Sequence, residues 1–211
     1  MNNGTIGNRV CVFGASRECI PEEVKTFAHE LGILLAENNY GLVFGAGATG
    51  LMGACARGVY SRGGEIIGVI PEKLNKPGIY FENCTRRIVT ETMHERKALM
   101  EKLSCAFIAL PGGFGTIEEL AEVLTLKQLG YHNHPIIIVN LLGYYDNFLN
   151  QLKRCVTDGY THNVYLDSFT VATTAEQVIE QLQHHVAHAM PNKLETLDSN
   201  CSDNKNQSEA G

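Results

Sequence analysis

Short apolar runs alternate along the chain with longer segments in which apolar residues recur every three or four positions. A short apolar run between turn residues is typical of a buried strand, and the longer spacing is typical of an amphipathic helix. The runs predict strands over residues 10–14, 42–44, 65–70, 87–90, 105–110, 135–140 and 168–171. The spaced segments predict helices over residues 21–37, 51–60, 92–103, 116–129, 144–157 and 174–189.

This regular alternation of strands and helices favours an α/β sandwich with a largely parallel sheet. The unbroken run of Ile and Val at 136–139 suits a strand that is buried on both faces. Ligands of such sheets bind outside the carboxyl ends of the strands. Three predicted strand ends carry Gly14, Gly45 and Gly112, and we expect them to face one crevice.

The chain length of 211 residues suits one domain with flanking segments. We predict a single domain over residues 9–189, preceded by a flexible N-terminus over residues 1–8. Residues 190–211 are rich in Asn, Ser, Asp and Glu and poor in apolar side chains. Such a composition cannot bury enough apolar surface to order a chain, so a disordered tail is predicted there.

The segment from 105 to 129 combines an apolar strand, a turn at 111–115 that contains Pro and three Gly, and a helix start at Thr116. A glycine turn before a helix N-terminus can cradle a phosphate, because the backbone approaches the anion closely and the free N–H groups attract it. The same residues also fit a capping box, with Thr116 as N-cap and Glu119 three positions later. The local pattern favours neither interpretation.

A second glycine motif, Gly-Ala-Gly-Ala-Thr-Gly, stands at 45–50 between a predicted strand and a predicted helix. This is the context of a dinucleotide-binding fingerprint. Two features weaken the match. The motif follows the second strand rather than the first, and Glu65 begins the next strand, whereas the ribose-binding acid usually ends it. A dinucleotide-dependent oxidoreductase nevertheless remains an alternative at this point.

Two charged residues fall on apolar helix faces. On a helical wheel, Arg96 lies within the arc formed by Met93, Leu99, Met100 and Leu103. An arginine in that position must extend to solvent, pair with a carboxylate or point into a cleft that holds an anion. Glu119 shares a stripe with Val123 and Leu126. We expect Arg96 and Glu119 to be partners across a site, and a purely structural ion pair is the alternative.

Composition narrows the classes of function. The net charge is −6 and no basic stripe is present, so no nucleic-acid surface is expected. Seven cysteines without a Cys-x-x-Cys pattern predict a reduced, cytoplasmic chain rather than a disulfide scaffold or zinc site. The chain has no signal-peptide core and no apolar run long enough to span a membrane. His184, His185 and His188 lack acidic or cysteine neighbours, and we expect them to face solvent without a metal.

The two motifs around these charged residues resemble the LOG ("Lonely Guy") family. The first is Met-His-Glu-Arg-Lys-Ala at 93–98, and the second is Pro-Gly-Gly-Phe-Gly-Thr-Ile-Glu-Glu at 111–119, which fits the family pattern Pro-Gly-Gly-x-Gly-Thr-x-x-Glu. The resemblance spans most of residues 8–185. It implies a Rossmann-like three-layer α/β sandwich with a largely parallel sheet, a homodimer, and no cofactor. Chains of this kind were often labelled lysine decarboxylases, but nothing marks a lysine for pyridoxal phosphate.

The resemblance also implies an activity, which is hydrolysis of the N-glycosidic bond of cytokinin riboside 5′-monophosphates or AMP. Arg96 and Glu119 match the family's catalytic pair. The departures from the family fall at 13–17, where Cys-Gly-Ser-Ser is more usual, and at Gly78, where plant members carry a Glu-containing segment. A non-catalytic nucleotide or cofactor carrier, as in related molybdenum-cofactor proteins, is the other alternative. The expected substrate-contacting residues are Ser16, Lys97, Gly112, Gly113, Phe114, Gly115, Thr116, Ile117, Glu118 and Thr125.

Overall fold

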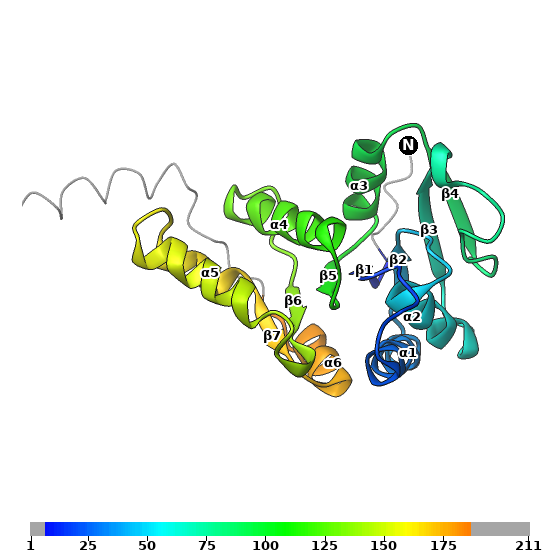
Figure 1. The fold of residues 1–211 in the computed structure, drawn as a ribbon, viewed down its shortest axis with the longest axis horizontal. Coiled ribbons are helices and arrows are strands. Elements are labelled where there is room, and N and C mark those ends of the chain that lie inside the picture. Colours follow the sequence, from blue (N-terminus) through cyan, green and yellow to red (C-terminus); the bar gives the residue numbers. More distant parts are fainter. Residues whose placement is uncertain (1–6, 187–211) are drawn as a thin grey trace, which may run out of the picture.

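Seven parallel strands form the central sheet, in the order β4-β3-β2-β1-β5-β6-β7 (Figure 1). The computed structural model describes residues 7–186. The predicted disordered tail, His188 and most of the predicted flexible N-terminus lie outside these residues. The strands are β1 (Arg9–Phe13), β2 (Gly41–Phe44), β3 (Ile66–Pro71), β4 (Arg86–Thr90), β5 (Ala106–Ala109), β6 (Ile136–Val139) and β7 (Thr170–Ala172).

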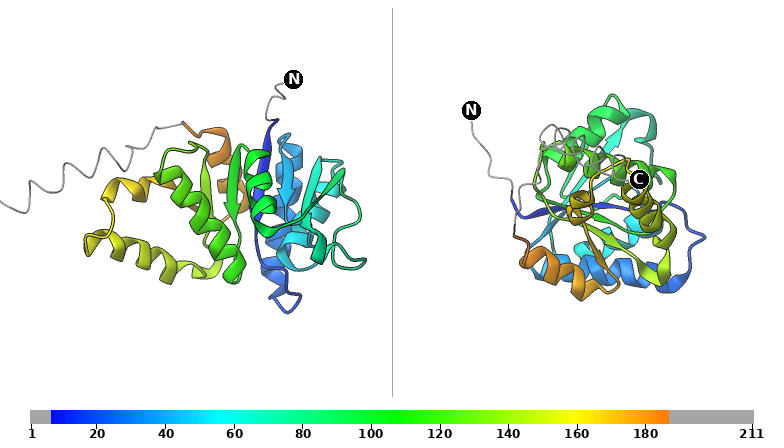
Figure 2. Two further views of the ribbon diagram at one scale, coloured as in Figure 1. Left: turned by 90° about the horizontal axis from the view of Figure 1, so that it is seen from above. Right: turned by 90° about the vertical axis from the view of Figure 1, so that its left-hand side faces the viewer.

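Helices cover both faces of this sheet, which confirms the three-layer α/β sandwich with a parallel sheet (Figures 1 and 2). One face carries α1, α2 and α6, and the other carries α3 and α4, while α5 lies at the end of the molecule farthest from β4. The helices are α1 (Glu22–Glu37), α2 (Gly50–Ser61), α3 (Met93–Lys102), α4 (Phe114–Gln128), α5 (Asp146–Thr157) and α6 (Ala175–Gln183). Three short 3₁₀ helices, η1 (Glu72–Leu74), η2 (Leu141–Gly143) and η3 (Asn163–Ser168), lie in the connections.

The strand pleat divides the core into two apolar clusters. In β1, Val10 and Val12 pack toward α1 and α2, whereas Cys11 and Phe13 pack toward α3 and α4. This division follows from the alternation of side chains along a strand. All four residues of β6 are buried, as expected for a strand that is covered on both faces.

The strand order places a crevice between β1 and β5. The chain adds β2, β3 and β4 on one side of β1, and then crosses to add β5, β6 and β7 on the other side. Phe13 and Ala109 are paired at the carboxyl ends of β1 and β5. Ligands of open α/β sheets bind at such a reversal of strand order. The fold therefore predicts a ligand-binding site at the carboxyl ends of β1 and β5.

Two predicted helix ends are wrong. Helix α4 begins at Phe114 with Gly113 as N-cap, so Thr116 lies in its first turn and the alternative of a capping box at Thr116 is excluded. The extended backbone at Gly113 allows the helix to start earlier than the Thr signal indicated. Helix α6 ends at Gln183, short of the predicted end at 189, and His184 is its C-cap.

Candidate active site

A cavity of about 520 Å³ opens at the carboxyl ends of the central strands. Its lining includes Gly14, which follows β1, and Gly45, which follows β2. After β5 the lining residue is Gly113, the chain neighbour of Gly112. The three glycine-bearing strand ends therefore do meet at one crevice. The complete lining is Gly14, Ala15, Ser16, Arg17, Gly45, Gly47, Thr49, Met52, Ile70, Leu74, Gly78, Ile79, Arg96, Gly113, Gly115, Thr116 and Glu119.

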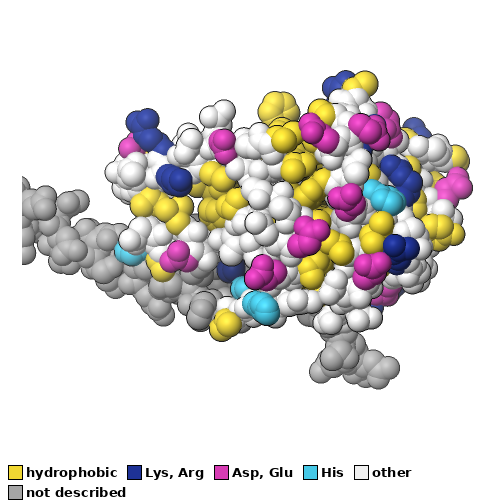
Figure 3. Space-filling model, turned by 90° about the horizontal axis from the view of Figure 1, so that it is seen from below, with side chains coloured by type: hydrophobic (Ala, Val, Ile, Leu, Met, Phe, Trp, Pro, Cys, Tyr) yellow, Lys and Arg dark blue, Asp and Glu magenta, His cyan; other side chains and the backbone are white. Residues whose placement is uncertain are grey.

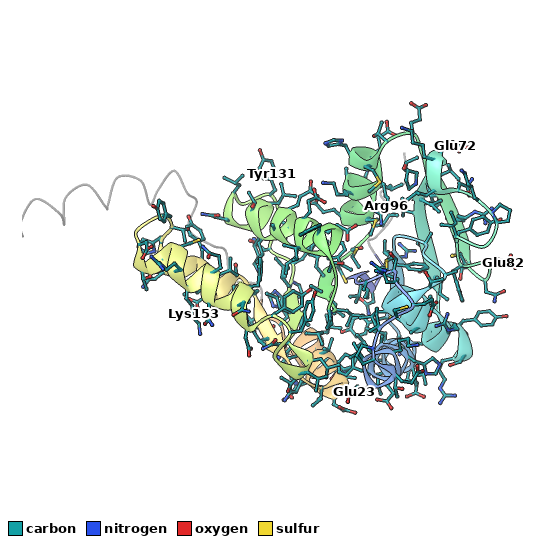
Figure 4. All side chains as sticks on the ribbon, in the orientation of Figure 1. Glu23, Glu72, Glu82, Arg96, Tyr131 and Lys153 are labelled. Atoms are coloured by element: carbon teal, nitrogen blue, oxygen red, sulfur yellow. The ribbon has the colours of Figure 1, made fainter. Side chains whose placement is uncertain are left out.

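Arg96 reaches this cavity from α3 and pairs with Glu119 of α4. Its Nη1 donates a hydrogen bond to Oε1 of Glu119 at 3.1 Å, and its Nε donates to the carbonyl of Val69 at 3.2 Å. Figure 4 labels Arg96 on the side of α3 that faces the strands. The helix begins at a Thr92 N-cap, whose hydroxyl accepts a hydrogen bond from the backbone N–H of Glu95. This cap fixes the start of α3, and with it the direction in which Arg96 points.

The carboxylate of Glu119 is largely removed from water, because only 8% of the residue is exposed. Burial raises the pKa of Glu119, and the adjacent guanidinium of Arg96 opposes this rise. A buried carboxylate that still faces a cavity can interact strongly with positive charge in a bound molecule, since little solvent screens it. The structure shows that Arg96 and Glu119 form an ion pair and that both line the cavity.

The glycine turn before α4 leaves open space beside the helix N-terminus. A Cβ built on Gly113 or Gly115 would meet no atom within 4 Å. At Gly112, by contrast, a Cβ would lie 2.2 Å from the hydroxyl oxygen of Thr116, so this position admits only glycine. Thr116 thus packs against the turn from inside the helix, and the N-terminal N–H groups of α4 lie beside the cavity.

The predicted substrate-contacting residues divide into two groups. Ser16, Gly113, Gly115 and Thr116 line the cavity together with the pair of Arg96 and Glu119, and Gly112 shapes the turn. Lys97 instead forms ion pairs with Glu118 and Glu122 of α4 and does not line the cavity. The remaining residues also lie outside the cavity lining, namely Phe114, which is 94% exposed, Ile117, and Thr125, whose hydroxyl donates to the carbonyl of Ala121.

Several residues that line the cavity were not predicted from the sequence. Met52, Leu74 and Ile79 add apolar side chains to the cavity wall. Leu74 and Ile79 belong to the segment between β3 and β4, for which the sequence predicted neither a strand nor a helix. This segment is held over the crevice by backbone hydrogen bonds from Ala48 to Ile79 and from Phe81 to Ala46. In the sequence, only the presence of apolar side chains within a connecting segment could have indicated that Leu74 and Ile79 line the cavity.

The structure does not support a dinucleotide site at the second glycine motif. The first N–H groups of α2 are already engaged, since Gly50 donates to a carboxylate oxygen of Glu18 and Leu51 donates to the carbonyl of Ala15. Glu65 forms an ion pair with Arg9 at 2.7 Å, at the opposite ends of the strands. A pyrophosphate would therefore meet a carboxylate and occupied donors at this helix.

Residues 7–186 carry no metal-binding cluster and no membrane-spanning helix. No group of three or more His, Cys, Asp or Glu side chains that could hold a metal occurs among these residues. His185 contacts the carbonyl of Asn133. Within the same residues, no helix is long and apolar enough to cross a membrane. On the face shown in Figure 3, basic side chains are scattered among acidic ones.

Comparison with known proteins identifies the family. The sequence pattern of a family described as "Possible lysine decarboxylase" matches residues 52–182. The cytokinin riboside 5′-monophosphate phosphoribohydrolase LOG1 of Arabidopsis thaliana is 39% identical over 178 residues, which cover 84% of each chain. The chain belongs to the LOG family. A probable LOG enzyme of rice, Oryza sativa subsp. japonica, named LOGL3, is 38% identical over 180 residues, or 85% of each chain.

Solved structures agree with the fold of this LOG-family chain. The molybdenum cofactor binding protein of Rippkaea orientalis matches with a TM-score of 0.65 at 21% identity, covering 84% of this chain and 96% of that one. The molybdenum cofactor carrier protein of Chlamydomonas reinhardtii matches with a TM-score of 0.63 at 22% identity, covering 85% and 99%. At these identities the likeness concerns the fold alone.

Proposed function

We propose that this chain is a phosphoribohydrolase that releases the free base and ribose 5-phosphate from cytokinin riboside 5′-monophosphates or AMP. The observation that carries the proposal is the buried pair of Arg96 and Glu119 beside an open glycine turn at the N-terminus of α4. The relatives named as phosphoribohydrolases support it over most of the chain. A screen of nucleoside 5′-monophosphates for released base, read by chromatography, tests it directly.

In the proposed mechanism, the 5′-phosphate lies on the turn at Gly113 and Gly115, where N–H groups and the helix dipole attract an anion. The ribose then lies beside Glu119. As the C1′–N bond breaks, its electron pair leaves with the base and positive charge develops on the sugar. The carboxylate of Glu119 stabilises this charge. A water oxygen bonds to C1′, and the proton that water loses is taken up by the departing base.

Arg96 has a positioning and electrostatic role in this scheme. Its guanidinium holds the Glu119 carboxylate at a fixed angle and favours the charged form, in opposition to the effect of burial. The apolar wall of Met52, Leu74 and Ile79 would then face the base. A wall of this chemistry accepts a purine or a purine with an apolar N6 substituent, which covers both AMP and the cytokinin nucleotides.

The substrate should require its 5′-phosphate. We expect kcat/KM for adenosine to be about 10²-fold lower than for AMP, because charge-assisted hydrogen bonds to the phosphate contribute ~3 kcal/mol. Gly115→Asp places a negative charge in the open space beside the turn. This variant should lower kcat/KM for AMP and leave the value for adenosine unchanged. Equal values for AMP and adenosine in the wild type would remove the phosphate cradle from the mechanism.

We further propose that the chain forms a homodimer through α4 and α5. Helix α5 is amphipathic but has no buried residue. A groove of about 340 Å³ between α4, α5 and η3 is lined by apolar side chains such as Leu124, Phe148 and Leu152. Phe114 and Tyr131, at the two ends of the α4 region, are 94% and 74% exposed. Exposed apolar surface of this kind is typical of a protein interface. A second copy of the chain would cover this surface of α4 and α5.

Light scattering on the purified protein should therefore give the mass of a dimer. Leu152→Asp, which places a charge in the groove, should yield a monomer. Asn150→Asp adds the same charge on an exposed position of α5 and should remain dimeric. A wild-type monomer, or a dimer that survives Leu152→Asp, would contradict this interface.

We also propose that residues 9–189 act as one catalytic domain in the cytoplasm. The cysteines of the described chain, Cys11, Cys19, Cys55, Cys84, Cys105 and Cys155, are all free thiols. Free thiols at this number suit a reducing compartment. Microscopy of a fluorescent fusion would show the location.

A further inference from the structure

Gly45, the residue that follows β2, lies directly against the guanidinium of Arg96. A Cβ built on Gly45 would lie 1.9 Å from Nη2 and 3.1 Å from Cζ of Arg96. Gly45 does not have the positive φ found at Gly50, so its backbone conformation is open to other residues. The space that a side chain at this position would occupy is therefore taken by the guanidinium of Arg96.

The other two edges of the same guanidinium are held by hydrogen bonds. Nε donates to the carbonyl of Val69 in β3, and Nη1 donates to Glu119 in α4. The group is planar and rigid, so a displacement of Nη2 also moves Nη1. The orientation of the Arg96 fork thus depends on three elements, which are the ends of β2 and β3 and the first half of α4.

We propose that Gly45 is a positioning residue, which admits the Arg96 guanidinium to the place where it can hold Glu119. The expected effect on hydrolysis rests on the proposed function, whereas the contact between Gly45 and Arg96 does not. This inference also gives the first and last glycines of the Gly-x-Gly-x-x-Gly motif a role other than dinucleotide binding. Its first glycine makes room for Arg96, and its last, Gly50, has a φ of +62° and would bring a Cβ within 2.4 Å of the carbonyl of Ala15.

Gly45→Ala should disturb catalysis through Arg96. The added methyl group drives the guanidinium away from Glu119, and misplacement of a catalytic group by about 1 Å can lower the rate about 10²-fold. Arg96 lowers the pKa of Glu119, so its displacement should raise that pKa. We therefore expect kcat on AMP to fall about 10²-fold and the acidic limb of the pH–rate profile to move to higher pH. If Gly45 had only a structural role, Gly45→Ala would leave the acidic limb of the pH–rate profile at the same pH.

A thermal-melt cycle tests the same contact without reference to activity. Gly45→Ala should lower Tm in the wild type, because it disrupts a buried ion pair. In an Arg96→Ala background the guanidinium is gone, so Gly45→Ala should leave Tm unchanged or raise it. Gly64→Ala is the control, since its Cβ would lie 2.7 Å from a Val59 methyl group, remote from Arg96. Its effect on Tm should be equal in both backgrounds.

Each outcome of the cycle decides the proposal. Equal losses of Tm from Gly45→Ala in both backgrounds would overturn it, as would wild-type activity and Tm in the single variant. If Gly45→Ala does not fold, folding of the double variant with Arg96→Ala supports the proposal, and failure of both overturns it. If no nucleoside monophosphate is hydrolysed, the proposed function fails, but the melt cycle still reports whether Gly45 acts through Arg96.

Discussion

Replacement of Glu119 by glutamine should lower the rate of base release from AMP by about 10²–10³-fold, the scale for one positioned electrostatic group. Glutamine keeps the shape of the side chain and can still accept the hydrogen bond from Arg96, but it lacks the charge that stabilises the developing sugar cation. The loss should appear in kcat and kcat/KM alike, because the interaction strengthens only in the transition state. Steady-state kinetics with chromatographic detection of adenine measures both constants.

The fold should survive Glu119→Gln, and circular dichroism with a thermal melt checks this. Glu37→Gln serves as the control, because Glu37 pairs with Arg62 on the surface and lies outside the cavity lining. It removes one carboxylate charge and should leave kinetics unchanged. Near wild-type turnover in Glu119→Gln would mean that the buried carboxylate is a structural partner of Arg96 and not a catalytic group.

Arg96→Lys should fail to restore the activity that Arg96→Ala loses, and both variants should lose about 10²-fold in kcat/KM. The guanidinium donates at the same time to Glu119 and to the carbonyl of Val69, from two nitrogens at fixed angles. A lysine ammonium is a point charge on a flexible stem and cannot reproduce this geometry. The lysine of the Arg96→Lys variant would supply the positive charge but would not hold the Glu119 carboxylate in its orientation.

Kinetics on AMP together with thermal melts separates the roles that Arg96 could have. Substantial activity in Arg96→Lys would show that only charge matters, and an active Arg96→Ala would remove the residue from the mechanism. A melt that collapses in both variants would point to a structural ion pair, since breaking a buried pair costs about 3–5 kcal/mol. Arg62→Lys on the surface is the control for the substitution, and surface pairs contribute at most ~1 kcal/mol.

The sequence anticipated the site better at some residues than at others. The placement of Arg96 and Glu119 on apolar helix faces led us to expect that they are partners, and the structure pairs them. Lys97, which stands next to Arg96 in the chain, lies instead among Glu118 and Glu122. A helix turns by about 100° per residue, so neighbours in sequence face different surroundings. The family resemblance implies that Lys97 and Glu118 contact the substrate, and that assignment stays a prediction.

The limits of local signals are clearest at α4. A Thr followed three positions later by Glu is a common helix start, yet the helix begins at Phe114 and Glu119 is drawn inward to Arg96. The capping box and the buried pair compete for the same carboxylate. The pair with Arg96 forms because α3 brings a buried cation to the crevice, and no pattern within the α4 segment carries that information.

By itself, the sequence determined the elements, their order and the parallel sheet, because apolar periodicity is a local property that each segment expresses on its own. It also placed Arg96 and Glu119 on apolar helix faces, where a pairing between them could be expected. Only the tertiary structure decided that they meet at 3.1 Å, that Gly45 makes room for the guanidinium, and that Leu74 and Ile79 wall the cavity. Those contacts join residues that are far apart in the chain, and they exist only once the ends of β1, β2, β3 and β5 are brought to one edge of the sheet.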